Sequence, residues 1–245
     1  MKEEKCDLLI QARLDSGRLP RKVLLPLFGK PLLDFVVERC LRAQRVRQVI
    51  LVTTEKKSDD PLIAYCEKRD LPYFRGSQED VLDRFVQAAR QFDSQWIVRI
   101  TADCPLIDPD LIDEMIDQFS AKQPLDYINT DQEHSLPRGL DVEIFSRAAG
   151  EKAHQRCQDP AEREHVTLFF KRNPDLFSLF TYHHNCNFAH YRVTVDTRED
   201  FSLVQSVLEG LYFAHPHFSM YELFDFLDKH PEIVRKNRWI QQKIP

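Results

Sequence analysis

Glycine is scarce in this chain, which contains six glycines among 245 residues, whereas average usage would give roughly 17. Any two of the glycines lie at least eleven positions apart. A P-loop needs two glycines five positions apart, and a dinucleotide-binding turn needs three within six residues. The spacing therefore excludes both glycine-rich phosphate cradles. A phosphate site in this protein must rely on other groups.

The sequence also lacks an excess of positive charge and any long apolar run. Its 34 lysines and arginines are outnumbered by 39 acidic residues, giving a net charge of −5. Dedicated nucleic-acid binders usually carry a basic excess, so we expect no nucleic-acid partner, although local basic clusters leave small anionic ligands open. No stretch approaches the ~18 apolar residues of a membrane span, and the charged N-terminus differs from a signal peptide. We expect a cytoplasmic protein that binds no membrane.

Closely spaced cysteines are missing as well. The six cysteines contain no C-x-x-C pair and are at least 26 residues apart. This distribution is typical of reduced thiols and does not fit a disulfide framework or a zinc site.

Short apolar segments recur through the chain and predict strands. In the first half they are rich in isoleucine, valine and aromatic residues, and each is too short for a helix with its own buried face. The second half is less regular but contains three more such segments. The predicted strands are residues 8–11, 48–53, 72–74, 96–101, 140–145, 177–182 and 191–195.

Helix-capping patterns lie between these segments. They predict helix starts at Asp60-Pro61, Ser77-x-x-Asp80, Asp108-Pro109 and Thr197-x-x-Asp200. Further helices are predicted over residues 161–171 and 219–244, the latter as a docking or oligomer element. The alternation of strands and helices predicts an α/β fold with a mostly parallel central sheet covered by helices on both faces. We expect one domain over residues 1–245, with an elaborated portion from about residue 120 onward.

A basic loop follows the first predicted strand. Residues 12–22 contain four cations, one hydroxyl group at Ser16 and one glycine at Gly17. Arginine makes bidentate contacts with phosphate oxygens, lysine supplies a mobile point charge, and a glycine turn can present backbone amides to an anion. The loop is therefore a candidate phosphate site. The alternative is a solvated basic loop, which describes most charge runs.

Two aspartates follow predicted strands and form a candidate metal site. Asp103 comes directly after residues 96–101, and Asp196 comes after residues 191–195. Ligands of open α/β sheets bind at the carboxyl ends of strands. Magnesium usually takes one or two protein carboxylates and completes its shell with phosphates and water. The alternative for Asp196 is a helix cap or a partner of the helix dipole.

Other polar segments have weaker signals. Gly76-Ser77 fits a strand-to-helix turn in which the serine contacts a ligand or only caps the helix. Asp141 and Glu143 share one face of a strand by its period of two, as functional carboxylates or as a polar outer face. Glu164-His165, at the start of a helix, could position a base or a substrate contact, and the alternative is a structural histidine.

Taken in order, these segments resemble the SpsF-type cytidylyltransferases, within the larger group of acylneuraminate and 3-deoxy-manno-octulosonate cytidylyltransferases. The matching stretches cover nearly the whole chain from residue 8 to about 205. They are Ile10 to Leu24, Phe74 to Arg84, Arg99 to Ile107, Gly139 to Glu143, Arg163 to Thr167, and Arg192 to Thr197.

The resemblance implies a nucleotide-diphospho-sugar transferase fold of the GT-A-like kind, often a homodimer, that uses CTP and Mg²⁺. Asp103 and Asp196 would be the magnesium ligands and, with Arg13 and Lys22, the catalytic groups. The portion from about residue 120 to 245 would serve acceptor binding and possible dimerisation. The remaining roles implied are contacts to nucleotide and acceptor. The nucleotide set is Ala12, Arg13, Ser16, Gly17, Arg18, Lys22, Arg75, Ser77, Arg84, Thr101 and Asp103, with Arg75, Ser77 and Arg84 near the base and ribose; the acceptor set is Asp141, Glu143, Glu164, His165 and Arg192.

One position departs from the family pattern. The family usually has glycine immediately before the lysine of the first loop, where this chain has Arg21. If that position requires a left-handed backbone, arginine costs roughly 1–2 kcal/mol. Arg21 could instead add another phosphate contact.

The resulting hypothesis is a magnesium-dependent transfer of CMP from CTP to a sugar or sugar-acid acceptor, with release of pyrophosphate, for a surface polysaccharide. One alternative is a related nucleotidyltransferase with a phosphorylated or phosphonate acceptor, or with another nucleotide. A second is a catalytically silent nucleotide-binding subunit that regulates glycan assembly.

Overall fold

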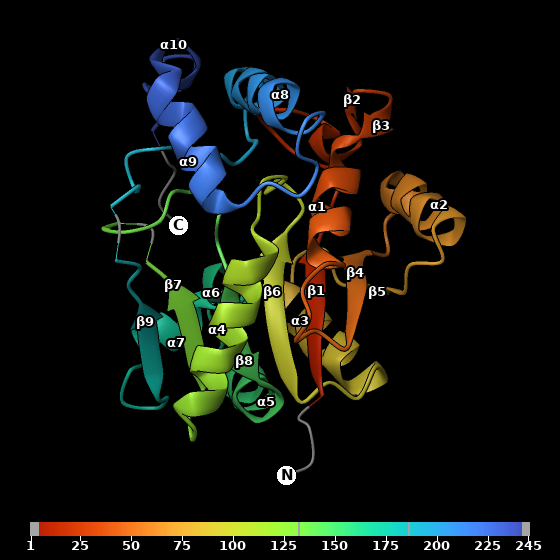
Figure 1. Cartoon of the computed structure of the whole chain (residues 1–245). Helices are drawn as coiled ribbons and strands as arrows, with labels where there is room; N and C mark the ends of the chain where they lie inside the picture. Colours follow the sequence, from red (N-terminus) through yellow and green to blue (C-terminus); the bar gives the residue numbers. More distant parts are fainter. Residues whose placement is uncertain (1–4, 132, 186, 242–245) are drawn as a thin grey trace.

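A seven-stranded sheet forms the centre of the computed structural model, which describes residues 5–131, 133–185 and 187–241 (Figure 1). The strand order is β5-β4-β1-β6-β8-β7-β9. Only β8, in the described ranges, runs antiparallel to its neighbours in this sheet, so the predicted mostly parallel sheet is confirmed. The strands are β1 Cys6–Gln11, β4 Gln48–Thr54, β5 Tyr73–Gly76, β6 Trp96–Thr101, β7 Tyr127–Thr130, β8 Glu143–Ser146 and β9 Leu179–Tyr182.

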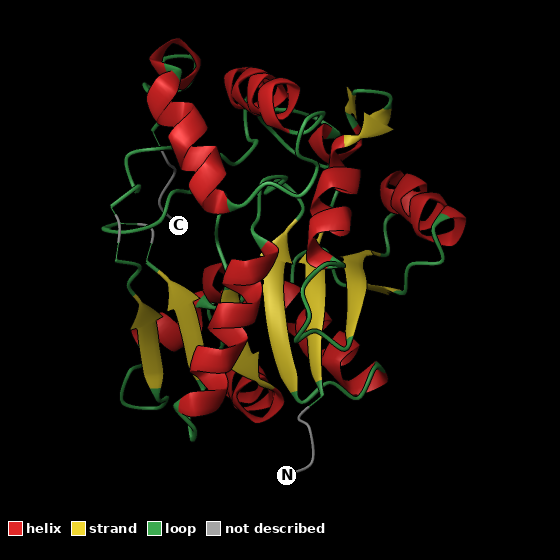
Figure 2. Ribbon diagram, in the orientation of Figure 1, coloured by secondary structure: helices red, strands yellow, loops and turns green. Residues whose placement is uncertain are grey.

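Helices connect and cover the strands, and a small hairpin precedes α1 (Figure 2). The hairpin pairs β2 Pro26–Leu27 with β3 Lys30–Pro31. Short 3₁₀ turns are η1 Lys22–Leu24 and η2 Lys57–Asp59. The α-helices are α1 Leu32–Cys40, α2 Asp60–Lys68, α3 Val81–Gln91, α4 Pro109–Ala121, α5 Arg147–Arg156, α6 Pro160–Glu164, α7 Leu168–Arg172, α8 Arg198–Leu211, α9 Met220–Lys229 and α10 Pro231–Val234.

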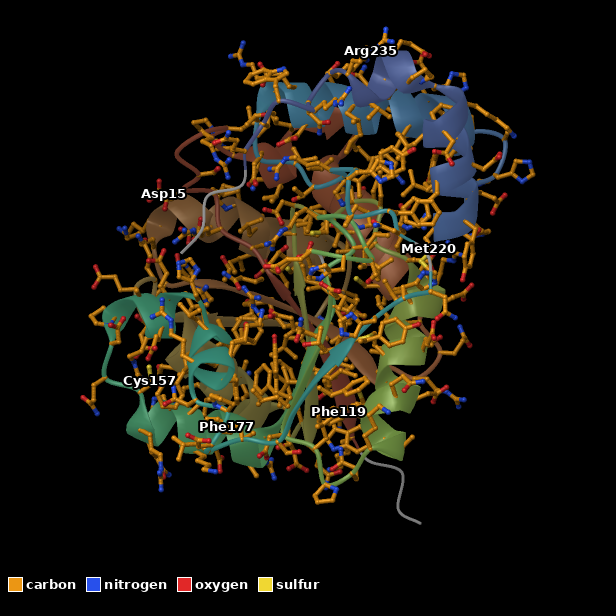
Figure 3. All side chains as sticks on the ribbon, turned by 90° about the vertical axis from the view of Figure 1, so that its left-hand side faces the viewer. Asp15, Phe119, Cys157, Phe177, Met220 and Arg235 are labelled. Carbon is orange, nitrogen blue, oxygen red and sulfur yellow. The ribbon has the colours of Figure 1, made fainter. Side chains whose placement is uncertain are left out.

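The alternation of side chains along β1 divides the core into two layers. Leu8 and Ile10 join the cluster that contains α1, α2, α4, α8 and α9, whereas Leu9 joins the cluster that contains α3, α5 and α7. Figure 3 shows the two layers, with Cys157 beyond α5 on one side and Phe119 of α4 on the other. The prediction of helices on both faces is therefore confirmed.

The first four predicted strands and two of the predicted caps are confirmed. The Asp108 carboxylate accepts hydrogen bonds from the backbone N–H groups of Asp110 (2.8 Å) and Leu111 (3.3 Å) at the start of α4. Thr197 and Asp200 form the predicted capping box of α8. The capping bonds at these helix starts are formed by residues close in sequence, which is why the sequence pattern reveals them.

Two predicted caps are wrong in detail. Asp60 is the first residue of α2, not its cap, and the preceding Asp59 uses its carboxylate on the backbone N–H of Leu14 (2.8 Å) and on the Thr54 hydroxyl. These contacts with residues outside the helix take the place of capping. The bond to Leu14 also anchors the basic loop.

The second wrong cap is Ser77. The α3 helix begins one turn later, with Asp80 as its cap, accepting from the N–H of Asp83 at 2.9 Å. The Ser77 hydroxyl instead accepts from the N–H of Asp80 at 3.0 Å and so forms the turn that leads into the helix.

The second half departs further from prediction. The strand predicted over 140–145 is β8 at 143–146, and residues 191–195 form no ladder, only a bridge between Arg192 and Arg138. That extended segment bonds to loop carbonyls, as described below. The pattern did not single out β7 or α5.

The predicted helices of this half are interrupted. The one over 161–171 is split into α6 and α7 by Val166, whose φ is 50°. The tail helix breaks at Pro231, which has no N–H to continue it, and residues 242–244 of that prediction lie outside the described part.

The described cysteines, Cys6, Cys40, Cys66, Cys104 and Cys157, are buried free thiols, and Cys186 lies outside the described residues, as do residues 1–4 of the charged N-terminus. None of the helices within the described ranges combines the length and the apolar character needed to cross a lipid bilayer.

Candidate active site

A cavity of about 500 Å³ lies at the carboxyl ends of β1 and β6. The loop after β1 forms one wall, and the turn after β6 forms another. Nine of the site residues that the sequence predicts line this cavity together. They are Ala12, Arg13, Ser16, Gly17, Arg18, Lys22, Thr101, Asp103 and Asp196. The sequence reasoning did not single out Gln11, Asp15, Val23 and Ala102, which also line it.

Lys22 lies at the floor of the cavity between the two aspartates. Its ammonium Nζ is 2.6 Å from Asp103 Oδ2 and 2.7 Å from Asp196 Oδ1. Burial by itself would lower the pKa of Lys22, but the two carboxylates outweigh burial and raise the pKa above its ordinary value. The ammonium is thus firmly charged and shared by two chain segments far apart in sequence.

The second oxygen of Asp196 faces two arginines. Asp196 Oδ2 is 2.9 Å from Arg18 Nη2 and accepts a hydrogen bond from Arg192 Nη2 at 2.7 Å. Burial opposes ionisation, but Lys22, Arg18 and Arg192 together lower the pKa of Asp196. The carboxylate is therefore ionised at neutral pH and held from both sides.

Backbone contacts place the two aspartates next to each other. The Val195 N–H donates to the Asp103 carbonyl at 2.8 Å, and the Thr194 hydroxyl donates to the same oxygen at 3.2 Å. In the same segment, the Val193 N–H donates to the Arg138 carbonyl at 2.7 Å. Residues 191–195 are extended because they make these bonds to the carbonyls of Asp103 and Arg138. The segment thus acts as a strap that carries Asp196 to the end of β6.

Gly139 makes this strap possible. Its φ is 109°, and a Cβ added there would lie 2.5 Å from the backbone carbon of Val193 and the backbone nitrogen of Thr194. No other residue combines that conformation with so close an approach of two backbones. This glycine is required by the site's geometry rather than by a phosphate contact.

The turn before Lys22 has the left-handed geometry that the family's glycine suggests. Arg21 has φ 57° and ψ 24°, its N–H donates to the Leu14 carbonyl at 3.0 Å, and Lys22 then opens the η1 turn. Arg21 therefore has the backbone strain that a left-handed conformation imposes on a residue other than glycine. Its side chain is exposed.

The residues expected near the base and ribose lie beside this cavity rather than in its lining. Arg75 and Ser77 line a neighbouring cavity of about 590 Å³ at the ends of β4 and β5. Arg84 is fully buried and donates to the Ser77 carbonyl at 2.9 Å, and its Nε and Nη2 have no partner among the described residues. Burial, and then the charge of Arg13, lower the pKa of Arg84 to about 10. Gly76 leaves room for this side chain, since a Cβ there would lie 2.9 Å from Arg84 Cγ.

The residues expected at the acceptor are spread around the cavity mouth and the adjoining core. Glu164 and His165 are exposed at the end of α6, with Glu164 Oε1 at 3.6 Å from Arg13 Nη2. Asp141 accepts from the Gly139 N–H at 2.6 Å, and burial raises the pKa of its carboxyl. Arg192 faces Asp196 and Asp200.

Glu143 differs from the other acceptor candidates because it is buried within a network. Its Oε1 accepts hydrogen bonds from Tyr127 (2.6 Å), Thr167 (2.7 Å) and Lys171 (3.2 Å), and its Oε2 pairs with Arg99. Burial alone would raise the pKa of Glu143, but these partners lower it far below its usual range. Its contacts join three strands and α7.

The aspartate pair fits a hard divalent cation. Asp103 and Asp196 offer ionisable oxygens within one cavity, beside cations that suit phosphate. The described ranges contain no group of three or more His, Cys, Asp or Glu side chains that could hold a metal by themselves. A bound Mg²⁺ would therefore draw further oxygens from a ligand or from water, as this ion commonly does.

The α/β fold, with its mostly parallel seven-stranded sheet and flanking helices, is similar to that of solved nucleotidyltransferases. The chain resembles the solved CMP:2-keto-3-deoxy-manno-octonic acid synthetase complexed with CTP at a TM-score of 0.67, with 16% identity over 84% of this chain and 99% of that one, which reflects a shared fold. A cytidylyltransferase structure from Leptospira borgpetersenii matches with a TM-score of 0.90 and 34% identity over 99% of both chains.

The particular family follows from sequence. The family model described as cytidylyltransferase matches residues 8–223, and the chain belongs to this family. The spore coat polysaccharide biosynthesis protein SpsF of Bacillus subtilis is 34% identical over 91% of this chain and 94% of that protein. The resemblance seen in the ordered motifs is thus confirmed.

Proposed function

We propose that the protein transfers CMP from CTP to a hydroxyl group of a sugar or sugar acid, with Mg²⁺ as cofactor and pyrophosphate as the second product. The observation that carries this proposal is the Lys22 ammonium shared by Asp103 and Asp196 at the floor of a basic cavity. The two carboxylates can bind a cation, and the ammonium next to them can bind phosphate oxygens.

The basic loop supports the triphosphate role. Arg13, Arg18 and Lys22 line one cavity, and its volume of about 500 Å³ lies within the usual range of ligand pockets, about 300–1,000 Å³. Lys22 would leave the carboxylates and pair with phosphate oxygens, placing its charge where the departing pyrophosphate gains charge. Arg13 and Arg18 are suited to hold those oxygens through bidentate contacts.

Asp103 and Asp196 would hold the Mg²⁺, which would supply neutralisation of charge on the phosphate oxygens. The acceptor hydroxyl attacks the α-phosphorus of CTP. The new P–O bond forms as the bond to the β-phosphate oxygen breaks. Pyrophosphate leaves with the bonding electron pair, and the hydroxyl proton is released. No covalent enzyme intermediate is needed.

The neighbouring cavity supports the placement of base and ribose. Arg75 and Ser77 line it, and Arg84, which donates to the Ser77 carbonyl, has buried donors without a partner among the described residues. A buried unpartnered donor is costly, so a ligand oxygen within its reach would be favoured. The relative solved with CTP and the family membership favour cytosine as that base.

We place the acceptor on the side of Arg13 where Glu164 Oε1 lies 3.6 Å from Arg13 Nη2. The other proposed acceptor contacts are His165, Asp141, Glu143 and Arg192. The role of SpsF in spore coat polysaccharide biosynthesis favours a sugar or sugar acid destined for a surface polysaccharide. We further propose that residues 1–245 act as one domain and pair as a homodimer, which sedimentation velocity would reveal as a single species of twice the chain mass.

Each of the four nucleoside triphosphates, incubated with Mg²⁺ and a panel of sugar, sugar-acid and phosphorylated or phosphonate acceptors, tests the proposal through pyrophosphate release. We expect release with CTP and a sugar or sugar-acid acceptor. Asp103→Ala is expected to lower turnover at least 100-fold with its circular dichroism unchanged.

The other results of this screen define the alternatives. Near-normal turnover of Asp103→Ala contradicts the metal assignment. Release with another nucleotide, or only with a phosphorylated acceptor, makes the protein a different nucleotidyltransferase. Tight CTP binding without turnover on any acceptor makes it a silent nucleotide-binding subunit.

A further inference from the structure

The chain after α10 returns to the start of α8 and buries one polar side chain there. Asn237 is 2% exposed, whereas its neighbours Arg238 and Trp239 are exposed. Figure 3 marks Arg235, where this segment leaves α10 at the top of the molecule. Asn237 lies beyond residues 8–223, which match the family model, and no sequence motif pointed to it.

The Asn237 amide contacts two groups on the strap and on α8. Its Nδ2 donates to the Arg192 carbonyl at 3.0 Å and to Asp200 Oδ1 at 2.8 Å. A primary amide has two N–H groups, so both bonds form together.

Asp200 in turn organises the start of α8. Its carboxylate is fully buried and accepts from Arg192 Nε at 2.9 Å, Arg192 Nη2 at 3.2 Å, and the backbone N–H groups of Asp196 (3.0 Å) and Thr197 (3.1 Å). The capping role read from the sequence is thus only part of what this carboxylate does.

Arg192 connects this arrangement to the candidate active site. The same Nη2 that contacts Asp200 donates to Asp196 Oδ2 at 2.7 Å. The contacts therefore run without a gap from Asn237 through Asp200 and Arg192 to the carboxylate proposed to hold the metal.

We propose that Asn237 is a positioning residue for the Asp196 carboxylate, acting through Asp200 and Arg192. The inference rests on the proposed function, because it assigns Asn237 to the geometry of a proposed metal ligand. Removing the amide frees Asp200 Oδ1 from one of its donors and leaves the Arg192 carbonyl without this bond. The guanidinium then gains freedom to rotate, and Asp196 loses its fixed direction.

The test compares Asn237→Ala with Lys236→Ala. Lys236 anchors the same segment to α8, with its Nζ donating to the Ser206 hydroxyl at 2.6 Å, but the bonds that the structure gives it include none to Asp200 or Arg192. Binding of Mn²⁺ is measured by electron paramagnetic resonance in the presence of CTP, alongside thermal unfolding. Both variants are expected to lower Tm by about 2–4 °C. Only Asn237→Ala is expected to weaken Mn²⁺ binding, by about tenfold.

Asn237→Asp adds a second readout, because it keeps the side-chain shape and sets a carboxylate against Asp200. We expect it to weaken Mn²⁺ binding at least as much as Asn237→Ala. Equal Mn²⁺ affinity of both Asn237 variants and Lys236→Ala would overturn the positioning role.

Asp196→Asn separates this failure from a failure of the proposed function. If Asp196→Asn loses Mn²⁺ binding while the Asn237 variants keep it, the inference alone fails. If Asp196→Asn binds Mn²⁺ as the wild type does, the metal role of Asp196 fails and the inference fails with it.

Discussion

At the scale of single residues, the site depends on side chains whose charge and backbone conformation are both constrained. Lys22 is fixed by two carboxylates, and the residue before it, Arg21, adopts a left-handed conformation that L-residues disfavour. The loop thus combines a strained turn with a firmly held ammonium. Backbone strain of this kind is often concentrated near functional groups.

Arg21→Gly should relieve that strain. We expect the free energy of unfolding to rise by about 0.5–1 kcal/mol, because the relief of the left-handed conformation exceeds the extra entropy that glycine gives the unfolded chain. Urea denaturation measures the change. Arg21→Ala is the matched control, since it removes the exposed guanidinium and keeps the strain, and it should leave stability within about 0.5 kcal/mol. A glycine variant no more stable than the alanine variant would contradict the account.

At the scale of secondary structure elements, the strap of residues 191–195 and the network around Glu143 hold the second half of the sheet in place. The strap bonds to carbonyls of the loops after β6 and β7 rather than to a strand. The Glu143 carboxylate joins β8 to β6, β7 and α7. Both arrangements depend on contacts between residues far apart in the sequence.

Gly139→Ala tests the strap. A Cβ at this position would lie 2.5 Å from the strap's backbone, so the strap must move and carry Asp196 with it. We expect a loss of more than about 2 kcal/mol in the free energy of unfolding, together with a large loss of turnover. Gly17→Ala serves as the control for stability, because a Cβ there would meet no atom of the described residues within 4 Å. Equal stability of the two variants would argue against a crowded strap.

Glu143→Gln tests the network through its pH dependence. At pH 7 we expect the free energy of unfolding to fall by about 2–3 kcal/mol. The reason is that Gln has one acceptor oxygen and no charge, whereas the surrounding donors pair with both oxygens of an ionised carboxylate. The pKa of Glu143 is lowered in the folded state. Its stabilising contribution is therefore fully present above the unfolded value of about 4.3 and is lost as the pH falls from there toward the folded pKa.

The expected signature is a difference in stability between wild type and Glu143→Gln that narrows from pH 7 to pH 3, as followed by urea denaturation. A difference that stays constant with pH would contradict an ionised, network-bound Glu143. The same variant also bears on the acceptor prediction, since a direct acceptor contact would raise the KM for the acceptor.

Elements that are determined by contacts between residues close in sequence could be predicted, and elements that depend on distant contacts could not. Thr197 and Asp200 cap α8 through neighbours in sequence, so their pattern was sufficient. Residues 191–195 have the alternation of a strand, but their partners are loop carbonyls, which no local pattern specifies. The left-handed backbone of Val166 interrupts a helix that the sequence pattern predicted as continuous.

At the scale of the whole molecule, the candidate site was largely predictable because most of its residues follow β1 and β6, which are adjacent parallel strands of one sheet. The carboxyl ends of such strands meet at one edge, so Asp103 and the basic loop had to lie close together. The support behind them was not predictable. Asn237 reaches Asp200 from the end of the chain, and Glu143 of β8 is held by partners from three other elements, β6, β7 and α7.

The fate of the α-phosphate tests the central claim most directly. CTP labelled with ³²P at the α-position is incubated with the enzyme, an acceptor that supports pyrophosphate release, and Mg²⁺, with and without EDTA. We predict that the label moves to the acceptor as CMP, that transfer requires the acceptor, and that EDTA abolishes it. Label released as free CMP without an acceptor, or transfer that persists in EDTA, would contradict metal-dependent cytidylyl transfer.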